Sequence, residues 1–309
     1  MTSPAPVVLV FLDTAFPEGR TADASKPQLL VTDQGATRGD GIFETMLATG
    51  GTVRKIQAHL DRLAGSAEAL DLEIPSGEAW RRAIAAALGG HRSQHPPADA
   101  SGEELVVKLV VTRGVEGASS PTAWVQVSAA GTLARHQRET GLDVILLDRG
   151  YDSDVAERAP WLLLGAKTLS YAVNMAALRH ARKQGADDVI FISSDGRVLE
   201  GPTSTVLLAH VETSDDGTAV KRLITPQLDS GILPGTSQGA LFTAAKAAGW
   251  ELGYGPLEPQ DLLDADAVWL ISSVRLLAPV NHIDGKAIGT PSLQKELTAE
   301  LNGLFSGIQ

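Results

Sequence analysis

The length, charge and composition of the chain exclude several classes of protein. Its 309 residues are enough for two domains with separate cores. A net charge of −11 with no basic face disfavours a nucleic-acid partner. The absence of cysteine excludes disulfides, thiolate nucleophiles and Cys-ligated metals, and we do not expect the seven histidines to form a metal site. We therefore expect no resident metal.

Two features of the sequence bear on location. The apolar stretch 1–12 has no Lys or Arg ahead of it and runs straight into Asp13, which favours a first strand over a signal peptide. No segment of the sequence approaches the ~20 apolar residues that span a bilayer. We expect a cytoplasmic protein with no membrane partner.

The first third of the chain is predicted to mix strands and helices. After the strand that ends near residue 12, a hairpin is expected over 41–56, with its turn at Gly50 and Gly51. An apolar stripe predicts a helix over 59–70, and Ser76 is suited to cap a second one. The stretch 89–103, rich in Gly, Pro and Ser, is expected to be a variable surface loop. Further strands are expected over 104–112 and 123–128.

The second half is predicted to form a separate domain. The polar stretch 133–140 is expected to link a small α+β domain, 1–132, to a larger one, 141–309. The expected elements of the larger domain are a strand over 144–147, a helix over 169–183, a hairpin of strands 189–193 and 198–208 turning at Asp195-Gly196, a helix over 236–248, a strand over 268–272 and a helix over 293–304. Because strands and helices mix without regular βαβ spacing, we expect an α+β fold.

Lys167 is the first candidate for chemistry. It follows the apolar run 161–164 and precedes the expected helix, so we expect it to lose hydration. Desolvation makes an amine nucleophilic, and a nucleophilic amine forms Schiff bases with carbonyls. From its position alone, a lysine whose head reaches water is the more common case.

Glu200 and the stretch 231–237 are the next candidates. Glu200 ends a predicted strand beside a Gly-Pro bend, where its carboxylate could keep a pyridine nitrogen protonated, although a solvated glutamate is the default. Gly235 lets the backbone come close to a ligand, and Thr236 and Ser237 offer hydroxyls and N–H groups at a helix start. That arrangement suits a phosphate, although most such sites are ordinary helix caps.

Two further segments carry groups that bind anions. Ser272 and Ser273 end an apolar strand and supply a second pair of hydroxyls. Arg62 lies beside the apolar stripe of its predicted helix, where a guanidinium could grip a phosphate. A surface arginine paired with a nearby acid is the simpler interpretation of that segment.

Taken in order, the motifs of this sequence resemble those of the branched-chain aminotransferase-like, fold-type IV family of enzymes that use pyridoxal 5′-phosphate (PLP). The resemblance covers about residues 34–285. The matching stretches are Arg38-Gly39-Asp40-Gly41-Ile42-Phe43-Glu44-Thr45, His59-x-x-Arg62-Leu63, Lys167-Thr168-Leu169-Ser170-Tyr171, Asn174, Gly196-Arg197-Val198-Leu199-Glu200-Gly201, Thr225-Pro226, Ile232-Leu233-Pro234-Gly235 and Ser272-Ser273-Val274-Arg275. One departure is Gln238, which stands where the family commonly has an arginine.

The resemblance implies a role for each candidate. Lys167 would be the catalytic lysine that forms the Schiff base with PLP, and Glu200 would pair with the pyridine nitrogen. Tyr171 would lie near the ring oxygen of the cofactor. The residues that would complete the cofactor site, most of them around the phosphate, are Arg62, Leu233, Thr236, Ser237 and Ser273. The family fold implies a small α+β domain and a larger barrel-like one, with PLP in the crevice between them, in a homodimer.

Three activities of the family fit the sequence to different degrees. The first is a lyase that splits aminodeoxychorismate into p-aminobenzoate and pyruvate for folate synthesis. The others are transamination of D-amino acids and of branched-chain L-amino acids. The stretch 38–45 and the short spacing from Lys167 to Tyr171 look more like the lyase and D-amino-acid branches. A non-catalytic homologue that only binds PLP is the alternative from another class.

Overall fold

The protein is described by a computed structural model that covers residues 7–13, 15–96, 102–214 and 217–308. These residues form two units. The first contains the chain up to Gly131 together with Ala166–Tyr171, and the second contains Thr132–Gly165 and Ala172–Ile308. The mixture of helices and largely antiparallel strands in both units confirms the predicted α+β class.

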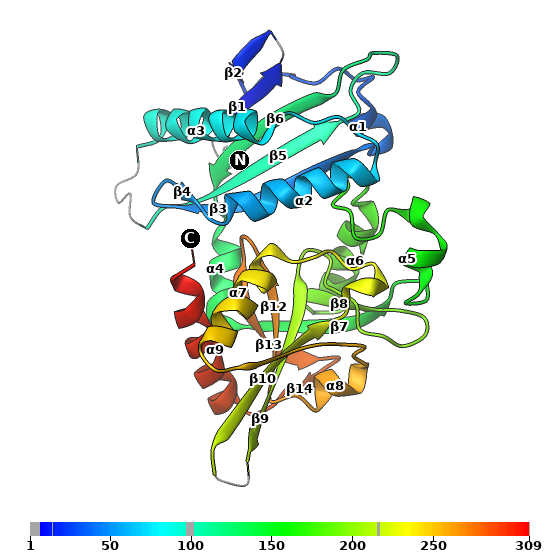
Figure 1. Cartoon of the computed structure of the whole chain (residues 1–309), viewed down its shortest axis with the longest axis vertical. Helices are drawn as coiled ribbons and strands as arrows, with labels where there is room; N and C mark the ends of the chain where they lie inside the picture. Colours follow the sequence, from blue (N-terminus) through cyan, green and yellow to red (C-terminus); the bar gives the residue numbers. More distant parts are fainter. Residues whose placement is uncertain (1–6, 14, 97–101, 215–216, 309) are drawn as a thin grey trace. The chain divides into compact units, whose positions relative to one another are not determined.

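The first unit is built on a six-stranded antiparallel sheet. Its strand order is β2-β1-β6-β5-β3-β4. The strands are β1 (Val7–Asp13), β2 (Phe16–Ala22), β3 (Gly41–Thr49), β4 (Thr52–Val53), β5 (Glu104–Thr112) and β6 (Thr122–Ala129), and the helices are α1 (Gln34–Arg38), α2 (Ile56–Ala69) and α3 (Gly77–Gln94). Helix α2 packs along β3, and α3 packs on β1, β2 and β6 (Figure 1).

Buried Asp33 fixes the entrance to β3. Its carboxylate caps α1 by accepting from the N–H of Gly35 at 2.8 Å. The same carboxylate accepts from the hydroxyls of Thr112 and Thr122, at 3.0 and 2.8 Å. Helix α1 then ends at Gly39, whose φ of 69° is in the left-handed region that glycine tolerates. The segment before β3 is therefore tied to strands β5 and β6.

The second unit contains an eight-stranded mixed sheet. Its order is β11-β10-β9-β12-β13-β7-β8, with β14 on β13. The strands are β7 (Leu142–Asp148), β8 (Asp188–Ile192), β9 (Thr205–Thr213), β10 (Ala219–Pro226), β11 (Glu251–Gly255), β12 (Ala267–Ser272), β13 (Leu276–Ile283) and β14 (Lys286–Ala287). The helices are α4 (Thr132–Thr140), α5 (Val155–Arg158), α6 (Ala172–Lys183), α7 (Thr236–Ala247), α8 (Pro259–Leu263) and α9 (Pro291–Ser306).

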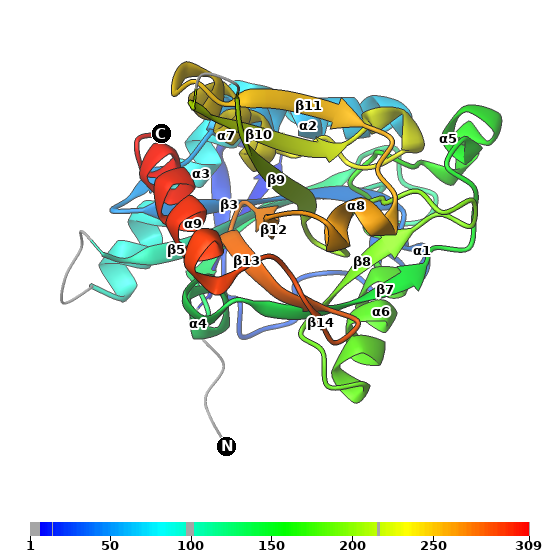
Figure 2. The ribbon, with the colours of Figure 1, turned by 90° about the horizontal axis from the view of Figure 1, so that it is seen from below.

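The central strands of this sheet are buried on both faces. In β9, Val206 faces one apolar cluster and Leu207 the other, and Trp269 of β12 shares the cluster of Leu207. Helices α7 and α9 cover that second cluster, contributing Leu241 and Leu297 among others (Figure 2). A strand buried on both faces is a continuous apolar run, as β9 and β12 are. The sheet therefore gives a rigid base to the helix start at Thr236.

Several predicted elements differ from the structure. Residues 133–140, expected to be a linker, lie in helix α4, which belongs to the second unit. Whether either unit is an independent domain stays a prediction. The expected loop 89–103 is helical up to Gln94, because the buried face of α3 continues from Ala83 and Ala87 to His91; positions 97–101 lie outside the described residues. The strand expected over 198–208 is broken at Gly201-Pro202. Residues 198–200 pair with β8, whereas β9, which begins at Thr205, pairs with β10 and β12.

A buried ion pair joins two parts of the second unit that are distant in sequence. Arg275, in the turn between β12 and β13, donates from Nη1 to Oδ2 of Asp188 at 2.6 Å, at the start of β8. Both side chains are almost fully buried, with 10% and 2% of their surface exposed. Gln137 of α4 accepts a longer bond, 3.5 Å, from the same Nη1. The pair holds the turn that carries Ser272 and Ser273.

We predict that Arg275→Ala lowers the free energy of unfolding by about 3–5 kcal/mol, because it leaves the Asp188 carboxylate buried without its counter-charge. Urea denaturation measures the loss. The matched control is Arg222→Ala, which removes an exposed arginine paired with Glu251 and should have a much smaller effect. Equal losses for the two variants would contradict the structural role of the buried pair.

Candidate functional site

Lys167 lies in an extended segment of the first unit that pairs with β3. The N–H of Phe43 donates to the carbonyl of Lys167 at 3.0 Å, and the N–H of Leu169 donates to that of Gly41 at 2.8 Å. The N–H of Lys167 donates to Oγ of Ser66 on α2 at 3.0 Å. Its backbone is therefore held from both sides, by a strand and by a helix.

Gly41 lies where β3 packs tightly against β5. A Cβ on this residue would lie 2.9 Å from Cα of Thr112 and would also meet the carbonyl oxygen of Val111, both on β5. Real Cβ atoms do not come so near to backbone atoms, so a side chain here would force β3 away from β5. The glycine thus has a steric role in placing β3, the strand with which residues 167–169 pair.

The amine of Lys167 lies over two aromatic rings. Its Nζ is 4.5 Å from the centroid of Phe43 and 5.7 Å from that of Tyr171. The two rings meet edge to face, with centroids 5.3 Å apart at 86°. Lys167 is half-buried, and these rings form one wall around its amine.

The environment of Lys167 differs from the prediction in two ways. The lysine is not at the head of a helix, since α6 begins at Ala172 and residues 167–169 use their backbone groups to pair with β3. The expected source of desolvation was also wrong, because Trp161 and Leu162 are exposed by 74% and 48%. Phe43 and Tyr171 half-bury the amine instead.

Arg62 forms a bidentate ion pair with Glu44, also in the first unit. Its Nε donates to Oε1 of Glu44 at 2.7 Å and its Nη2 donates to Oε2 at 2.9 Å. His59, one turn earlier on α2, contacts the same Oε2 through Nδ1 at 2.7 Å. Glu44 and His59 are fully buried. Arg62 is thus paired with an acid, but in a buried cluster and not at the surface, and its role towards a phosphate stays a prediction.

The pKa values in this cluster follow from burial and charge. Burial by itself raises the pKa of Glu44, but the hydrogen bonds from His59 and Arg62 and the charge of Arg62 together lower it to about 2. Burial lowers the pKa of His59, against the opposing effect of Glu44. Burial, followed by the charges of Arg54 and Arg62, lowers the pKa of Lys55 to about 7. Glu44 is thus ionised and His59 neutral at pH 7.

The second group of candidates lies at the start of α7, in the second unit. Oγ of Ser273 lies 3.3 Å from Oγ1 of Thr236 and 3.3 Å from Oγ of Ser237. Gly235 is the N-cap of the helix, and a Cβ there would come within 2.5 Å of Oγ1 of Thr205. Three hydroxyls and the first N–H groups of a twelve-residue helix thus converge where the backbone is bare, an arrangement suited to a phosphate.

Glu200 is the last residue of the short segment 198–200 that pairs with β8. Its Oε2 accepts from the N–H of Leu233 at 3.1 Å, which ties it to the loop before α7. Asn174 of α6 donates to the carbonyl of Pro202 at 2.7 Å and so holds the bend that follows. Burial raises the pKa of Tyr151, and the negative charge of Glu200 acts in the same direction. The carboxylate is therefore tied to the loop before α7, and the bend that follows Glu200 is held separately by Asn174.

The structure thus brings the candidates together in two sets. Lys167, Tyr171 and Arg62 belong to the first unit, and Glu200, Leu233, Thr236, Ser237 and Ser273 belong to the second. Sequence reasoning assigned no role to Glu44, His59 or Phe43. The sequence did offer one signal for Glu44, which is the only charged residue of the mainly apolar strand β3. Strand alternation directs its side chain to the opposite face from Phe43.

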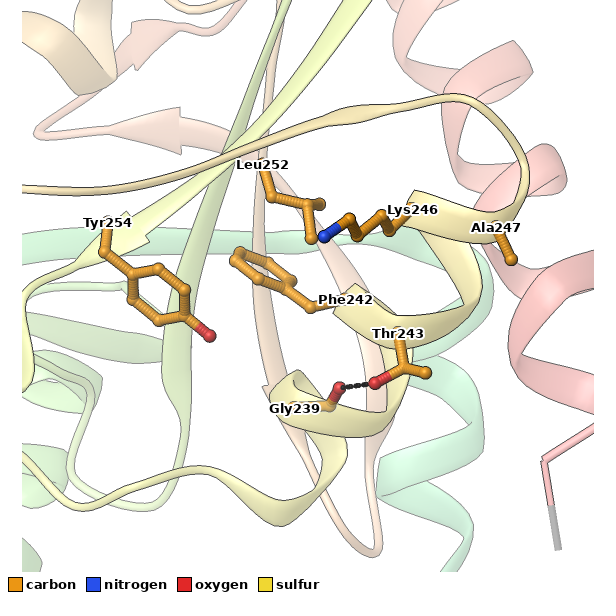
Figure 3. A pocket seen from close by; sticks show the side chains of 7 residues that line it. All are labelled: Gly239, Phe242, Thr243, Lys246, Ala247, Leu252 and Tyr254. Carbon is orange, nitrogen blue, oxygen red and sulfur yellow. Dashed lines mark hydrogen bonds between the residues drawn. The ribbon is translucent and has the colours of Figure 1, made fainter.

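A pocket of about 470 Å³ lies on the second unit, along the helix whose first turn carries Thr236 and Ser237 (Figure 3). It is lined by one face of α7, from Gly239 to Ala247, and by Leu252 and Tyr254 of β11. The rings of Phe242 and Tyr254 meet in its lining, with centroids 5.2 Å apart, and Lys246 contributes a charged side chain. The lining is mainly apolar and contains none of the predicted site residues.

The described residues offer neither a metal site nor a membrane-spanning helix. No group of three or more His, Cys, Asp or Glu side chains in that part of the chain could hold a metal ion. No helix within it is long and apolar enough to cross a membrane.

The chain belongs to the class IV aminotransferase family, whose model matches residues 41–283, and it has the fold of that family, fold-type IV. The bifunctional aminodeoxychorismate lyase / D-amino acid transaminase of Mycobacterium tuberculosis is 44% identical over 284 residues, 92% of this chain and 95% of that protein.

Solved structures agree with this family assignment. A hypothetical aminotransferase from M. tuberculosis in its PLP-bound form has a TM-score of 0.85 and 42% identity, over 97% of this chain and 98% of that one. A fold IV-transaminase from Curtobacterium pusillum has a TM-score of 0.85 and 41% identity, over 97% of each chain.

We predict that acid weakens the fold through Glu44. Because its pKa is about 2 in the folded protein and ordinarily 4.5, the carboxylate contributes stability above pH 4.5 that is lost as the pH falls towards 2. The contribution is on the order of 3 kcal/mol. Urea unfolding of the wild type and of Glu44→Gln measures it: the stability difference between them should shrink below pH 4.5. A difference that stays constant from pH 7 to pH 3 would contradict the assignment.

Proposed function

We propose that this enzyme is an aminodeoxychorismate lyase, which forms p-aminobenzoate and pyruvate, and that transamination of D-amino acids is its second activity. The observation that carries the proposal is the 44% identity, over nearly the whole of both chains, to a relative that bears both names. The short spacing from Lys167 to Tyr171 supports the same branch of the family. Branched-chain L-amino acids are the less favoured alternative.

The cofactor is PLP, and the residues of the chain fit it. A phosphate needs hydroxyls and backbone N–H groups around a bare backbone, and Gly235, Thr236, Ser237 and Ser273 provide them. An aldehyde needs an amine, and Lys167 supplies one against an aromatic wall. We propose that these residues hold the cofactor together with Tyr171, Arg62 and Leu233.

When bound, PLP supplies an electron sink for the pair of electrons left on the substrate carbon. Glu200 would keep a proton on the pyridine nitrogen, which needs an ionised carboxylate held in place, and the N–H of Leu233 holds it. Lys167 has two roles in turn. Its Nζ would bind the aldehyde of the cofactor and, when free, would take the proton from the substrate carbon that bears the amine.

The two activities diverge after this proton transfer. In the lyase reaction the bond between the ring carbon and the enolpyruvyl oxygen would break, the ring would become aromatic, and the enolpyruvate that leaves would take up a proton to become pyruvate. In transamination Lys167 would instead deliver its proton to the former aldehyde carbon of the cofactor, and water would release a keto acid. Lys167 and Glu200 serve both courses, so they do not select between them. We propose that the enzyme acts as a homodimer, as the resemblance implies, and that it is located in the cytoplasm.

We predict that the purified enzyme converts aminodeoxychorismate to p-aminobenzoate without any amino acceptor. It should also form pyruvate from D-alanine when 2-oxoglutarate is present, and form much less from L-alanine. Product analysis by liquid chromatography measures both reactions. Lys167→Ala, which removes the proton-transferring amine, should abolish both and remove the yellow absorption band of the lysine-bound cofactor.

Other outcomes of this experiment would change the proposal. Conversion of D-alanine with no p-aminobenzoate would overturn the lyase and leave the transaminase. Conversion of L-leucine in preference to both substrates would favour the branched-chain activity. A Lys167→Ala variant that retains the absorption band would contradict the assigned lysine.

A further inference from the structure

The buried cluster of Glu44, His59 and Arg62 contains two groups to which the mechanism above gives no task. Glu44 lies in β3 next to Phe43, and strand alternation directs it to the opposite side from the ring that faces Lys167. That side is covered by α2, which carries His59 and Arg62 one turn apart. The cluster therefore lies directly behind the strand that supports the lysine.

Both carboxylate oxygens of Glu44 accept hydrogen bonds within the cluster. Oε1 accepts from Nε of Arg62, and Oε2 accepts both from Nη2 of Arg62 and from Nδ1 of His59, all at 2.7–2.9 Å. Because Glu44 is an ionised acceptor, Nδ1 of His59 carries the hydrogen. The charges of Glu44 and Arg62 cancel, and His59 adds a bond without adding charge.

This arrangement fixes the orientation of the guanidinium. Two parallel bonds to one carboxylate define the plane of the fork, and they occupy its Nε–Nη2 edge. Nη1 is thereby directed away from Glu44. A free arginine side chain carries about 2 kcal/mol of rotamer entropy, so an arginine held in this way binds an anion with less ordering cost.

We propose that His59 and Glu44 are positioning residues that hold Arg62 in the orientation in which it binds the phosphate of the cofactor. The inference rests on the proposed role of Arg62. His59 fixes the carboxylate, and the carboxylate fixes the guanidinium. Neither residue is expected to touch the substrate or the cofactor.

His59 offers the cleaner test because replacing it leaves the charge of the cluster unchanged. His59→Leu removes the donor while filling a similar volume, and His59→Asn places an amide N–H near the position of Nδ1. The probes are PLP and pyridoxal, which has the same ring and aldehyde but no phosphate. Titration of the apoenzyme, followed by the visible band of the lysine-bound cofactor, gives both affinities.

We predict that His59→Leu weakens PLP binding about tenfold, the effect of losing one hydrogen bond to a charged group. Pyridoxal affinity should change by less than about twofold, and His59→Asn should restore PLP affinity. Equal weakening for PLP and pyridoxal would make the cluster merely structural and overturn the inference. So would an unchanged PLP affinity.

Two further variants complete the design. Arg62→Ala tests the premise that Arg62 binds the phosphate. If this variant keeps the wild-type preference for PLP over pyridoxal, the proposed phosphate role of Arg62 fails. If only His59→Leu keeps that preference, the role of Arg62 stands and the positioning role of His59 fails. If His59→Leu does not yield folded protein, the comparison is made with His59→Gln, whose longer amide reaches towards the Nε2 position. It should show the same selective loss of PLP affinity, and its absence would overturn the inference.

Discussion

The pairing of residues 167–169 with strand β3 is the interaction on which the rest of the candidate site depends. Two backbone hydrogen bonds, from Phe43 to Lys167 and from Leu169 to Gly41, attach the catalytic candidate to a strand that is itself clamped by β5. The same strand presents Phe43 to the amine and Glu44 to the arginine behind it. A shift of β3 by one residue would exchange these two faces.

The second unit supports its own set of candidate residues through different contacts. Strands β9 and β12 are buried on both faces, and the turn after β12 is held by the buried pair of Arg275 and Asp188. The hydroxyl of Ser273 and the first turn of α7 are therefore mounted on rigid elements. Rigid supports keep binding groups at productive distances, which a phosphate seat requires.

Much of this could be predicted from the sequence, but not all. The order of motifs identified the family, and apolar periodicity predicted most helices and strands. The extended conformation of Lys167 could not be predicted, because it results from a pairing with β3 more than a hundred residues away. The break at Gly201-Pro202 likewise depends on the pairing of β9 with β10 and β12, whereas the segment 198–200 pairs with β8. Glu44 was visible as one acid in an apolar strand, but its partners on α2 were not.

The central claim, that Lys167 is the lysine that carries the cofactor, can be tested most directly by borohydride reduction. The reagent fixes the cofactor to the lysine that holds it, and peptide mass mapping then locates the modification. We predict a phosphopyridoxyl group on Lys167 in nearly every labelled molecule. Labelling of another lysine, such as Lys55 with its lowered pKa, or no stable labelling at all, would contradict the account.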